Sequence, residues 1–318
     1  MKVIEKLPCA KELKEEIKLS KEVKRHKEML DGEIAAILRG ESNKFLLIVG
    51  PCSADDPSAV LEYANKMAKV ADVVRERICI VLRVFTAKPR TACSGYMGLI
   101  HEMDGIRIAR RLHLVVLEQT GLPTADELLY PATLPYFNDI INYFAVGARS
   151  SENQEHRLVA SGITAPVGIK NPPSGDLRSL ANAVTAAKVP HNFIFEGNMV
   201  QSCGNSLAHG ILRGGIKPNF ETKSLLNAKE TGLLNVIVDT NHANSGKDYK
   251  KQSEIAMHVL ENCQSPILKG FVKGLMIESY IEEGMAERGK QAFGQSITDP
   301  CLGFAGTEKL IYKIADKI

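Results

Sequence analysis

The sequence contains no tryptophan, and aromatic residues make up only 6% of its 318 residues. It lacks any apolar run close to the roughly 18 residues that a membrane-spanning helix needs. Its first residues, MKVIEKLPCAKELKEEIK, contain no apolar core of a secretory signal. A charge excess is also absent, because 40 lysines and arginines face 37 aspartates and glutamates. These absences argue against a membrane or a nucleic acid as a partner.

Paired cysteines are missing too, since the seven cysteines are odd in number, scattered and without a CxxC motif. This excludes a disulfide scaffold and is typical of a reducing compartment, where a cysteine is a core residue, a nucleophile or a metal ligand. We therefore expect a cytoplasmic protein. Hydrophobic residues make up 44% of the chain, enough for a sizeable core. The length suits a single α/β barrel, which has about 250 residues or more.

The N-terminal part differs in composition from the rest. Residues 10–39 are dense in charge, and their apolar residues recur at roughly helical spacing. This pattern predicts a solvated helix lying across the domain, with an oligomer contact as the functional alternative. We expect a helical extension over residues 1–40 and a catalytic barrel domain over residues 41–318.

Beyond residue 40, short β-branched runs alternate with amphipathic stretches, which implies parallel strands joined by crossover helices. Eight such runs predict an α/β fold, a closed (β/α)8 TIM barrel. An open Rossmann sheet would carry a G-x-G-x-x-G turn where this chain has GPCSADD. A ninth run, 191–197, is expected in an insertion before the sixth barrel strand. The eight runs are 45–50, 78–85, 122–129, 145–150, 166–171, 209–215, 233–245 and 267–279, and helices are expected over 57–73, 104–118, 134–144 and 176–188.

Each of the eight runs ends at or near a polar residue that a buried strand would normally avoid. Barrel active sites are assembled from the C-terminal ends of different strands, so these side chains should converge on one mouth. A paired structural ion explains any single one of them, but not all eight at the same end. The residues are Cys52, Arg83, Glu127, Arg149, Lys170, Arg213, His242 and Glu278.

The converging set is rich in positive charge. Six cations around one cavity would be costly to bury without anionic ligands. Arginine binds phosphate and carboxylate with two parallel hydrogen bonds, and lysine adds a point charge. We therefore expect two phosphorylated substrates, or one ligand with a phosphate and a carboxylate. The six are Arg83, Lys88, Arg90, Arg149, Lys170 and Arg213.

A second subset predicts a metal site. Cys52, His242 and Glu278 follow the first, seventh and eighth strands, which are neighbours around a closed barrel, and Asp299 comes soon after. A thiolate, an imidazole and two carboxylates suit one first-row divalent ion such as Mn²⁺, Fe²⁺, Co²⁺ or Zn²⁺.

At these residues the sequence resembles the class I 3-deoxy-D-arabino-heptulosonate 7-phosphate (DAHP) synthases. The resemblance extends from about residue 44 to 304 and is carried by IVGPCS, LRVFTAKPRT, VGARSSENQEHR, ASGITAPVGIKN, ILRGG, DTNHANSGKDYKKQ, MIESYIEEG and GQSITDPC. It implies a metal-dependent transferase that condenses phosphoenolpyruvate with D-erythrose 4-phosphate and water, giving DAHP and phosphate. This is the first step of the shikimate pathway, which leads to chorismate and the aromatic amino acids. A homodimer or homotetramer is also implied.

The resemblance further implies a role for each matching residue. Lys88 would donate a proton to the developing alkoxide, and Glu127 would position the water that adds at C2. Phosphoenolpyruvate would be held by Arg83, Lys88, Ala148, Arg149, Lys170 and Arg213, erythrose 4-phosphate by Pro89, Arg90, Thr91 and Asp299, and the metal by Cys52, His242, Glu278 and Asp299.

Three segments depart from the family pattern. The loop after KPRT reads ACSGYMGLIHEMDG, shorter than expected and with Met97 in place of a basic residue. The segment 193–209 and the N-terminal arm are short as well. Because that arm and segment help to form the aromatic amino-acid inhibitor site in regulated members, we expect weak or absent inhibition by Phe, Tyr or Trp.

Three alternatives stay open at this stage. A 3-deoxy-octulosonate 8-phosphate synthase would use arabinose 5-phosphate, although it typically shows KANRTS where this chain has KPRT. A Schiff-base aldolase would use Lys170 as its nucleophile. A non-catalytic phosphometabolite-binding barrel would keep the arginines and lose the metal ligands.

Overall fold

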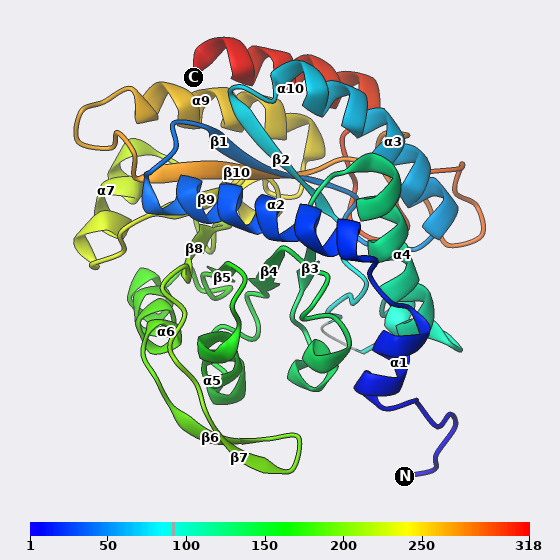
Figure 1. Ribbon diagram of the computed structural model, residues 1–318. Coiled ribbons are helices and arrows are strands. Elements are labelled where there is room, and N and C mark those ends of the chain that lie inside the picture. Colours follow the sequence, from blue (N-terminus) through cyan, green and yellow to red (C-terminus); the bar gives the residue numbers. More distant parts are fainter. Residues whose placement is uncertain (91–92) are drawn as a thin grey trace.

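The computed structural model describes residues 1–90 and 93–318, and within them eight parallel strands close into a barrel (Figure 1). The (β/α)8 TIM barrel expected from the sequence is thereby confirmed. Strand β1 pairs with both β2 and β10, so that Leu47 lies opposite Ile80 on one side and Leu275 on the other. The strands are β1 (Phe45–Gly50), β2 (Ile78–Arg83), β3 (Thr124–Glu127), β4 (Tyr143–Val146), β5 (Val167–Lys170), β8 (His209–Leu212), β9 (Val236–Asp239) and β10 (Val272–Glu278).

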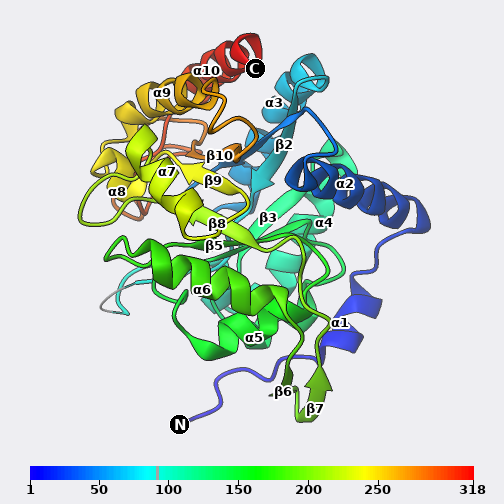
Figure 2. The same ribbon diagram turned by 90° about the vertical axis from the view of Figure 1, so that its left-hand side faces the viewer.

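Helices follow most strands and cover the outside of the barrel (Figure 2). Among the described residues, no helix is both long enough and apolar enough to span a bilayer. The helices are α1 (Ala10–Glu16), α2 (Lys21–Arg39), α3 (Pro57–Val74), α4 (Gly105–Thr120), α5 (Gln154–Gly162), α6 (Leu177–Lys188), α7 (Thr222–Glu230), α8 (His242–Ser245), α9 (Gln252–Cys263) and α10 (Phe304–Lys317), with 3-10 turns η1 (Leu99–His101), η2 (Pro131–Tyr136) and η3 (Tyr249–Lys251).

Three of the four named helix predictions are confirmed by α3, α4 and α6, but the helix expected over 134–144 is wrong. That segment contains the end of η2, a turn and the start of β4. Pro135 inside η2 has no N–H to continue a helical hydrogen-bond series. The barrel also needs Tyr143–Val146 as the strand between β3 and β5.

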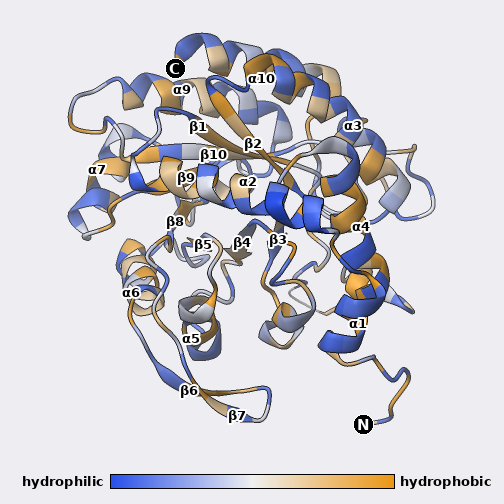
Figure 3. Ribbon diagram, viewed as in Figure 1, coloured by the Kyte–Doolittle hydropathy of each residue, from blue (hydrophilic) through white to orange (hydrophobic). Residues whose placement is uncertain are grey.

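The charged N-terminal segment forms two helices instead of one. Ser20 caps the second of them, α2, by accepting a hydrogen bond from the Val23 N–H, and Gly40 ends it in the left-handed region. The first half of α2 is hydrophilic, whereas strand β2 is hydrophobic (Figure 3). The second half buries Ile34 and Ile37 against the side chains inside the barrel. Helix α2 therefore closes the N-terminal end of the barrel, opposite to the ends where the predicted site residues lie.

The ninth run forms β6 (Asn192–Phe195), which pairs with β7 (Asn198–Gln201) in an antiparallel hairpin. The hairpin lies between α6 and β8 in the chain and projects away from the barrel (Figures 1 and 2). Its two-residue turn has positive φ angles at Glu196 and Gly197, as tight hairpins require. The predicted insertion before the sixth barrel strand is thus confirmed.

A neutral histidine is buried inside the barrel. The Tyr143 hydroxyl lies 2.7 Å from His209 Nε2, and His209 Nδ1 lies 2.8 Å from the Leu207 carbonyl oxygen. Because a carbonyl only accepts, Nδ1–H donates to Leu207 and Nε2 accepts from the Tyr143 hydroxyl. Burial lowers the pKa of His209 from 6.5 to about 4.

This histidine is expected to make folding sensitive to acid. The unfolded chain takes up the proton below pH 6.5 and the folded chain only near pH 4, so stability falls between these values. The loss should reach about 3 kcal/mol. Urea unfolding of wild type and His209→Gln at pH 7 and pH 4 checks this. The difference in the free energy of unfolding between the two proteins should change by that amount between the two pH values. A difference that is the same at both pH values would contradict the assignment.

Candidate active site

A cavity of about 200 Å³ opens at the C-terminal ends of the barrel strands. All eight residues predicted to converge there line it, as do four others from the predicted set. Ala148 is not part of the lining but precedes Arg149, and Thr91 lies outside the described residues. The lining residues are Cys52, Arg83, Phe85, Lys88, Pro89, Arg90, Glu127, Arg149, Lys170, Arg213, His242, Lys247, Glu278 and Asp299.

Two of the lining arginines carry unused hydrogen-bond donors. Arg83 is only 1% exposed, and its Nη2 donates to Glu278 Oε1 at 2.9 Å. Its Nη1, and Nε of Arg213, are buried and have no hydrogen-bond partner among the described residues. Burial also lowers the pKa of Arg213. Buried cationic donors without acceptors are expected to bind an anion in the cavity.

A second group of charges surrounds Asp239 at the end of β9. Lys170 Nζ lies 3.1 Å from Asp239 Oδ2, and His242 Nδ1 lies 2.9 Å from the same oxygen. Burial alone would raise the pKa of Asp239, but the adjacent His242 and Lys170 hold it well below its usual value. His242 has a φ of 52°, in the left-handed region that a histidine seldom adopts. The surrounding structure therefore holds the backbone of His242 in this conformation at an energetic cost.

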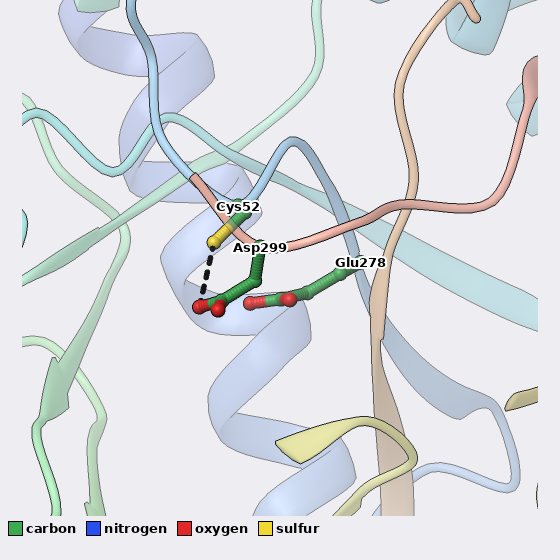
Figure 4. Close-up of side chains that lie close together, drawn as sticks. All are labelled: Cys52, Glu278 and Asp299. Carbon is green, nitrogen blue, oxygen red and sulfur yellow. Dashed lines mark hydrogen bonds between the residues drawn. The ribbon is translucent and has the colours of Figure 1, made fainter. Parts of the chain in front are cut away.

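The predicted metal ligands partly form one cluster. Donor atoms of Cys52, Glu278 and Asp299 lie within 4.8 Å of one another, and the three side chains point toward a common centre (Figure 4). Cys52 Sγ lies 3.4 Å from Asp299 Oδ2. His242 is at the edge of this cluster, with Nε2 3.7 Å from Glu278 Oε1. Asn241 donates to the other Glu278 oxygen at 2.6 Å and so fixes that carboxylate.

The electrostatics of this cluster suit a cation. Burial, with Glu278 adding to it, raises the pKa of the Cys52 thiol to about 11. Lys88 Nζ lies 2.7 Å from Cys52 Sγ and 2.9 Å from Asp299 Oδ2. Burial alone would raise the pKa of Asp299, but Lys88 holds it well below its usual value. A buried thiol together with two carboxylates is a donor set that fits a first-row divalent ion, which would also favour the thiolate.

Glu127 faces the cavity from the end of β3. Its Oε1 is buried without a hydrogen-bond partner among the described residues. Gly147 leaves the space for this carboxylate, since a Cβ there would lie 2.4 Å from Glu127 Oε1. A carboxylate with an unused buried oxygen in a cavity is suited to bind a water molecule or a substrate hydroxyl.

The loop after KPRT supports the site from outside. The backbone N–H of Lys88 donates to the Met97 carbonyl at 2.9 Å, and Arg90 Nε donates to the Tyr96 carbonyl at 3.0 Å. Gly98 has a φ of 109°, and a Cβ there would lie 2.4 Å from the Thr86 carbonyl oxygen. Of the described residues 93–104, none lines the cavity.

Two lining residues were missed by the sequence analysis. Phe85 stacks on Arg83, whose guanidinium lies 4.0 Å from the ring centre. Its position two residues after Arg83, on the same side of an extended chain, was the available signal. Lys247 lies in the NHANSGKD stretch, and its Nζ is 3.8 Å from Asp299 Oδ1. It stands at the mouth, with 71% of its side chain exposed.

Comparisons with known proteins agree with one another. The model of the DAHP synthetase I family matches residues 16–311. The Phe-sensitive phospho-2-dehydro-3-deoxyheptonate aldolase of Escherichia coli (strain K12) is 37% identical over 307 residues, which are 90% of this chain and 87% of the relative. The corresponding aldolase of Haemophilus influenzae is 36% identical over 305 residues, 89% of this chain and 83% of the relative. The structure of the aldolase from Francisella tularensis SCHU S4 has a TM-score of 0.93 and 33% identity, covering 100% of this chain and 98% of that one.

Proposed function

Because this chain belongs to the DAHP synthetase I family, we propose that it condenses phosphoenolpyruvate with D-erythrose 4-phosphate and water. The products are DAHP and inorganic phosphate. This condensation is the first reaction of the shikimate pathway. One observation carries this proposal: seven arginines and lysines line the same small cavity as a Cys–Glu–Asp cluster. That cavity matches substrates that bring two phosphates, a carboxylate and an aldehyde.

Phosphoenolpyruvate would bind in the cationic inner part of the cavity. The unused donors of Arg83 and Arg213 and the charges of Arg149 and Lys170 are suited to its phosphate and carboxylate. The Ala148 backbone amide and Lys88 would add to this set. Their preorganised charge would stabilise the phosphate as it leaves.

Erythrose 4-phosphate would enter over the KPRT segment. Arg90, at the cavity wall, would bind its phosphate, together with Pro89 and Thr91 of the same segment, and Asp299 would contact the sugar. The hydrogen bond from Arg90 to the Tyr96 carbonyl orients the guanidinium for this role. The aldehyde would then lie beside the Cys–Glu–Asp cluster.

Cys52, His242, Glu278 and Asp299 would hold one divalent ion (Mn²⁺, Fe²⁺, Co²⁺ or Zn²⁺), which supplies Lewis-acid polarisation of the aldehyde oxygen when bound. Lys88, whose ammonium lies 2.7 Å from Cys52 Sγ, would give a proton to the developing alkoxide after C3 of phosphoenolpyruvate attacks the aldehyde carbon. Glu127 would orient the water that adds at C2, through the oxygen that has no protein partner. Phosphate then leaves from C2.

The test is loss of phosphoenolpyruvate from purified, metal-loaded protein supplied with erythrose 4-phosphate, with and without EDTA. Consumption that needs both substrates and stops on chelation is expected. Consumption only with arabinose 5-phosphate would assign the sister octulosonate reaction. No turnover with either sugar phosphate, despite tight phosphoenolpyruvate binding, would favour a non-catalytic binding barrel.

A Schiff-base aldolase makes a different prediction. Lys170 is ion-paired with the buried Asp239, an arrangement opposite to the neutral amine that such an aldolase requires. Borohydride in the presence of substrate should therefore leave the mass of the protein unchanged. A stable adduct on Lys170 would overturn the assignment.

The oligomeric state and the cellular compartment are inferred from the family assignment and from features of the surface and the cysteines. We infer a homodimer or homotetramer, supported by the projecting β6–β7 hairpin, on which Ile194 and Met199 are exposed. Light scattering on the eluting protein gives the mass that tests this. A cytoplasmic site of action is supported by seven cysteines that are all free thiols.

Inhibition by aromatic amino acids is expected to be weak or absent, although the Escherichia coli relative is named Phe-sensitive. A groove of about 460 Å³ lies between the hairpin and α5. Arg39 is the one charged side chain among the described residues that line it, so no carboxylate is present for an α-ammonium group. Titrating Phe, Tyr and Trp into the activity assay tests this. Micromolar inhibition by any of them would show that the expectation is wrong.

A further inference from the structure

A buried carboxylate behind the active site joins three parts of the fold. Asp126, in β3, is only 4% exposed and does not line the cavity. Its Oδ1 accepts from the Thr86 N–H at 2.8 Å and from the Glu127 N–H at 2.7 Å. Its Oδ2 accepts from the Thr86 hydroxyl at 2.5 Å, and His113 Nε2 of α4 lies 3.3 Å away. Four donors thus converge on one side chain, which needs no ligand of its own.

The first consequence concerns the segment that carries Lys88. Strand β2 continues its pairing past Arg83, because the Val84 N–H donates to the Ala125 carbonyl at 2.8 Å. One step further, the Asp126 carboxylate takes the place of a backbone carbonyl and accepts the Thr86 N–H. This side chain therefore prolongs the ladder to Thr86, two residues before Lys88.

The second consequence concerns Glu127. The same Asp126 oxygen binds the Glu127 N–H, and the next N–H, that of Leu128, donates to the Ala145 carbonyl at 2.8 Å. The backbone of Glu127 is thereby fixed on both sides. The Asp126 carboxylate therefore holds the backbone near Lys88, which would donate the proton in the proposed reaction, and at Glu127, which would orient the water.

His113 anchors this carboxylate to the helical layer. Because Asp126 accepts, His113 Nε2 is the donor, and Nδ1 on the other side of the ring lies 2.9 Å from the Thr124 hydroxyl oxygen. The Thr124 hydroxyl therefore contacts His113 and not the Asp126 carboxylate itself. Thr86 and Thr124 are both buried, and each hydroxyl makes one hydrogen bond among the described residues.

We propose that Asp126 is a positioning residue for the condensation, and that its bonds to Thr86 and to the Glu127 N–H set the placement of Lys88 and of the Glu127 carboxylate. This inference rests on the proposed function. Phosphoenolpyruvate would be bound mainly by Arg149, Lys170 and Arg213, which lie at or just after the ends of β4, β5 and β8 and outside this network, with Lys88 adding to them. Loss of the network should therefore lower kcat by a larger factor than it raises the phosphoenolpyruvate KM.

The matched pair Thr86→Val and Thr124→Val tests this. Each variant removes one buried hydroxyl from the same network and keeps the side-chain shape. Thr86→Val should lower kcat about tenfold, because even small displacements of catalytic groups slow a reaction strongly. Thr124→Val should keep kcat within about twofold of wild type, because its hydroxyl does not contact Asp126. Equal kcat values in both variants, with lowered melting temperatures, would show a purely structural network and overturn the inference.

Two substitutions of Asp126 itself complete the experiment. Asp126→Ala leaves four donors without an acceptor and should lower kcat about a hundredfold. Asp126→Asn keeps one oxygen for the two backbone N–H groups and should recover most of that loss. Failure of Asn to exceed Ala, with both proteins folded, would overturn the inference. Wild type is assayed alongside: a wild type without turnover refutes the proposed function, whereas an active wild type with an equally active Thr86→Val refutes only the positioning role.

Discussion

Cys52→Ala is expected to lower turnover by about a thousandfold or more, because Lewis-acid assistance contributes several kcal/mol and each tenfold in rate corresponds to about 1.4 kcal/mol. Cys52 supplies the soft donor of the cluster and lies opposite Asp299 at 3.4 Å. Without it, a site of carboxylates and one imidazole binds first-row ions less tightly. The metal content of the dialysed protein, measured by inductively coupled plasma mass spectrometry, should fall together with kcat.

Cys301 offers a matched control for this experiment. It is buried like Cys52, and burial, with Cys52 adding to it, raises the pKa of its thiol well above the usual value. It is not part of the three-residue donor cluster found among the described residues. Cys301→Ala should therefore keep both metal content and kcat. Equal losses in the two variants would indicate a packing effect and argue against Cys52 as a ligand.

Local periodicity was sufficient to predict the barrel. Most of the strands are short and apolar and end at or near a polar residue, and the rule that parallel strands open their sites at one end then places those residues together. Cys52 and Glu278 are far apart in the sequence but lie just after and at the ends of neighbouring strands, since β1 pairs with β10. No comparable rule gives the position of His242 relative to Glu278, because a left-handed φ at His242 depends on contacts made only in the folded protein.

The errors and omissions have the same origin. The segment 134–144 has helical spacing of its apolar residues, but tertiary pairing of β4 with β3 and β5 outweighs that preference. Asp126 gave no signal, because a carboxylate inside a strand run looks like an exposed residue until the loop after β2 and helix α4 are packed around it. The sequence therefore predicted which residues face the cavity better than which residues hold them there.

Gly147→Ala is expected to lower kcat by about a hundredfold to a thousandfold, within the range associated with one general acid or base. The added Cβ would lie 2.4 Å from Glu127 Oε1 and 3.2 Å from its Cδ, so the carboxylate must move away. The atoms displaced are the far end of a flexible side chain, and the fold should survive. Comparing kcat, phosphoenolpyruvate KM and melting temperature with wild type checks this, with KM and melting temperature little changed.

The control for a general effect of an added methyl group is Gly306→Ala in α10, where a Cβ meets nothing within 4 Å. That variant should keep wild-type kcat and gain about 1 kcal/mol from the better helix propensity of alanine. A double-mutant cycle decides whether Gly147 acts through Glu127. If it does, Gly147→Ala combined with Glu127→Ala is no slower than Glu127→Ala alone, because the displaced group has already been removed. Multiplied losses in the double variant would instead mean that the methyl group obstructs the substrate directly, and Glu127 would lose its support as the residue that orients water.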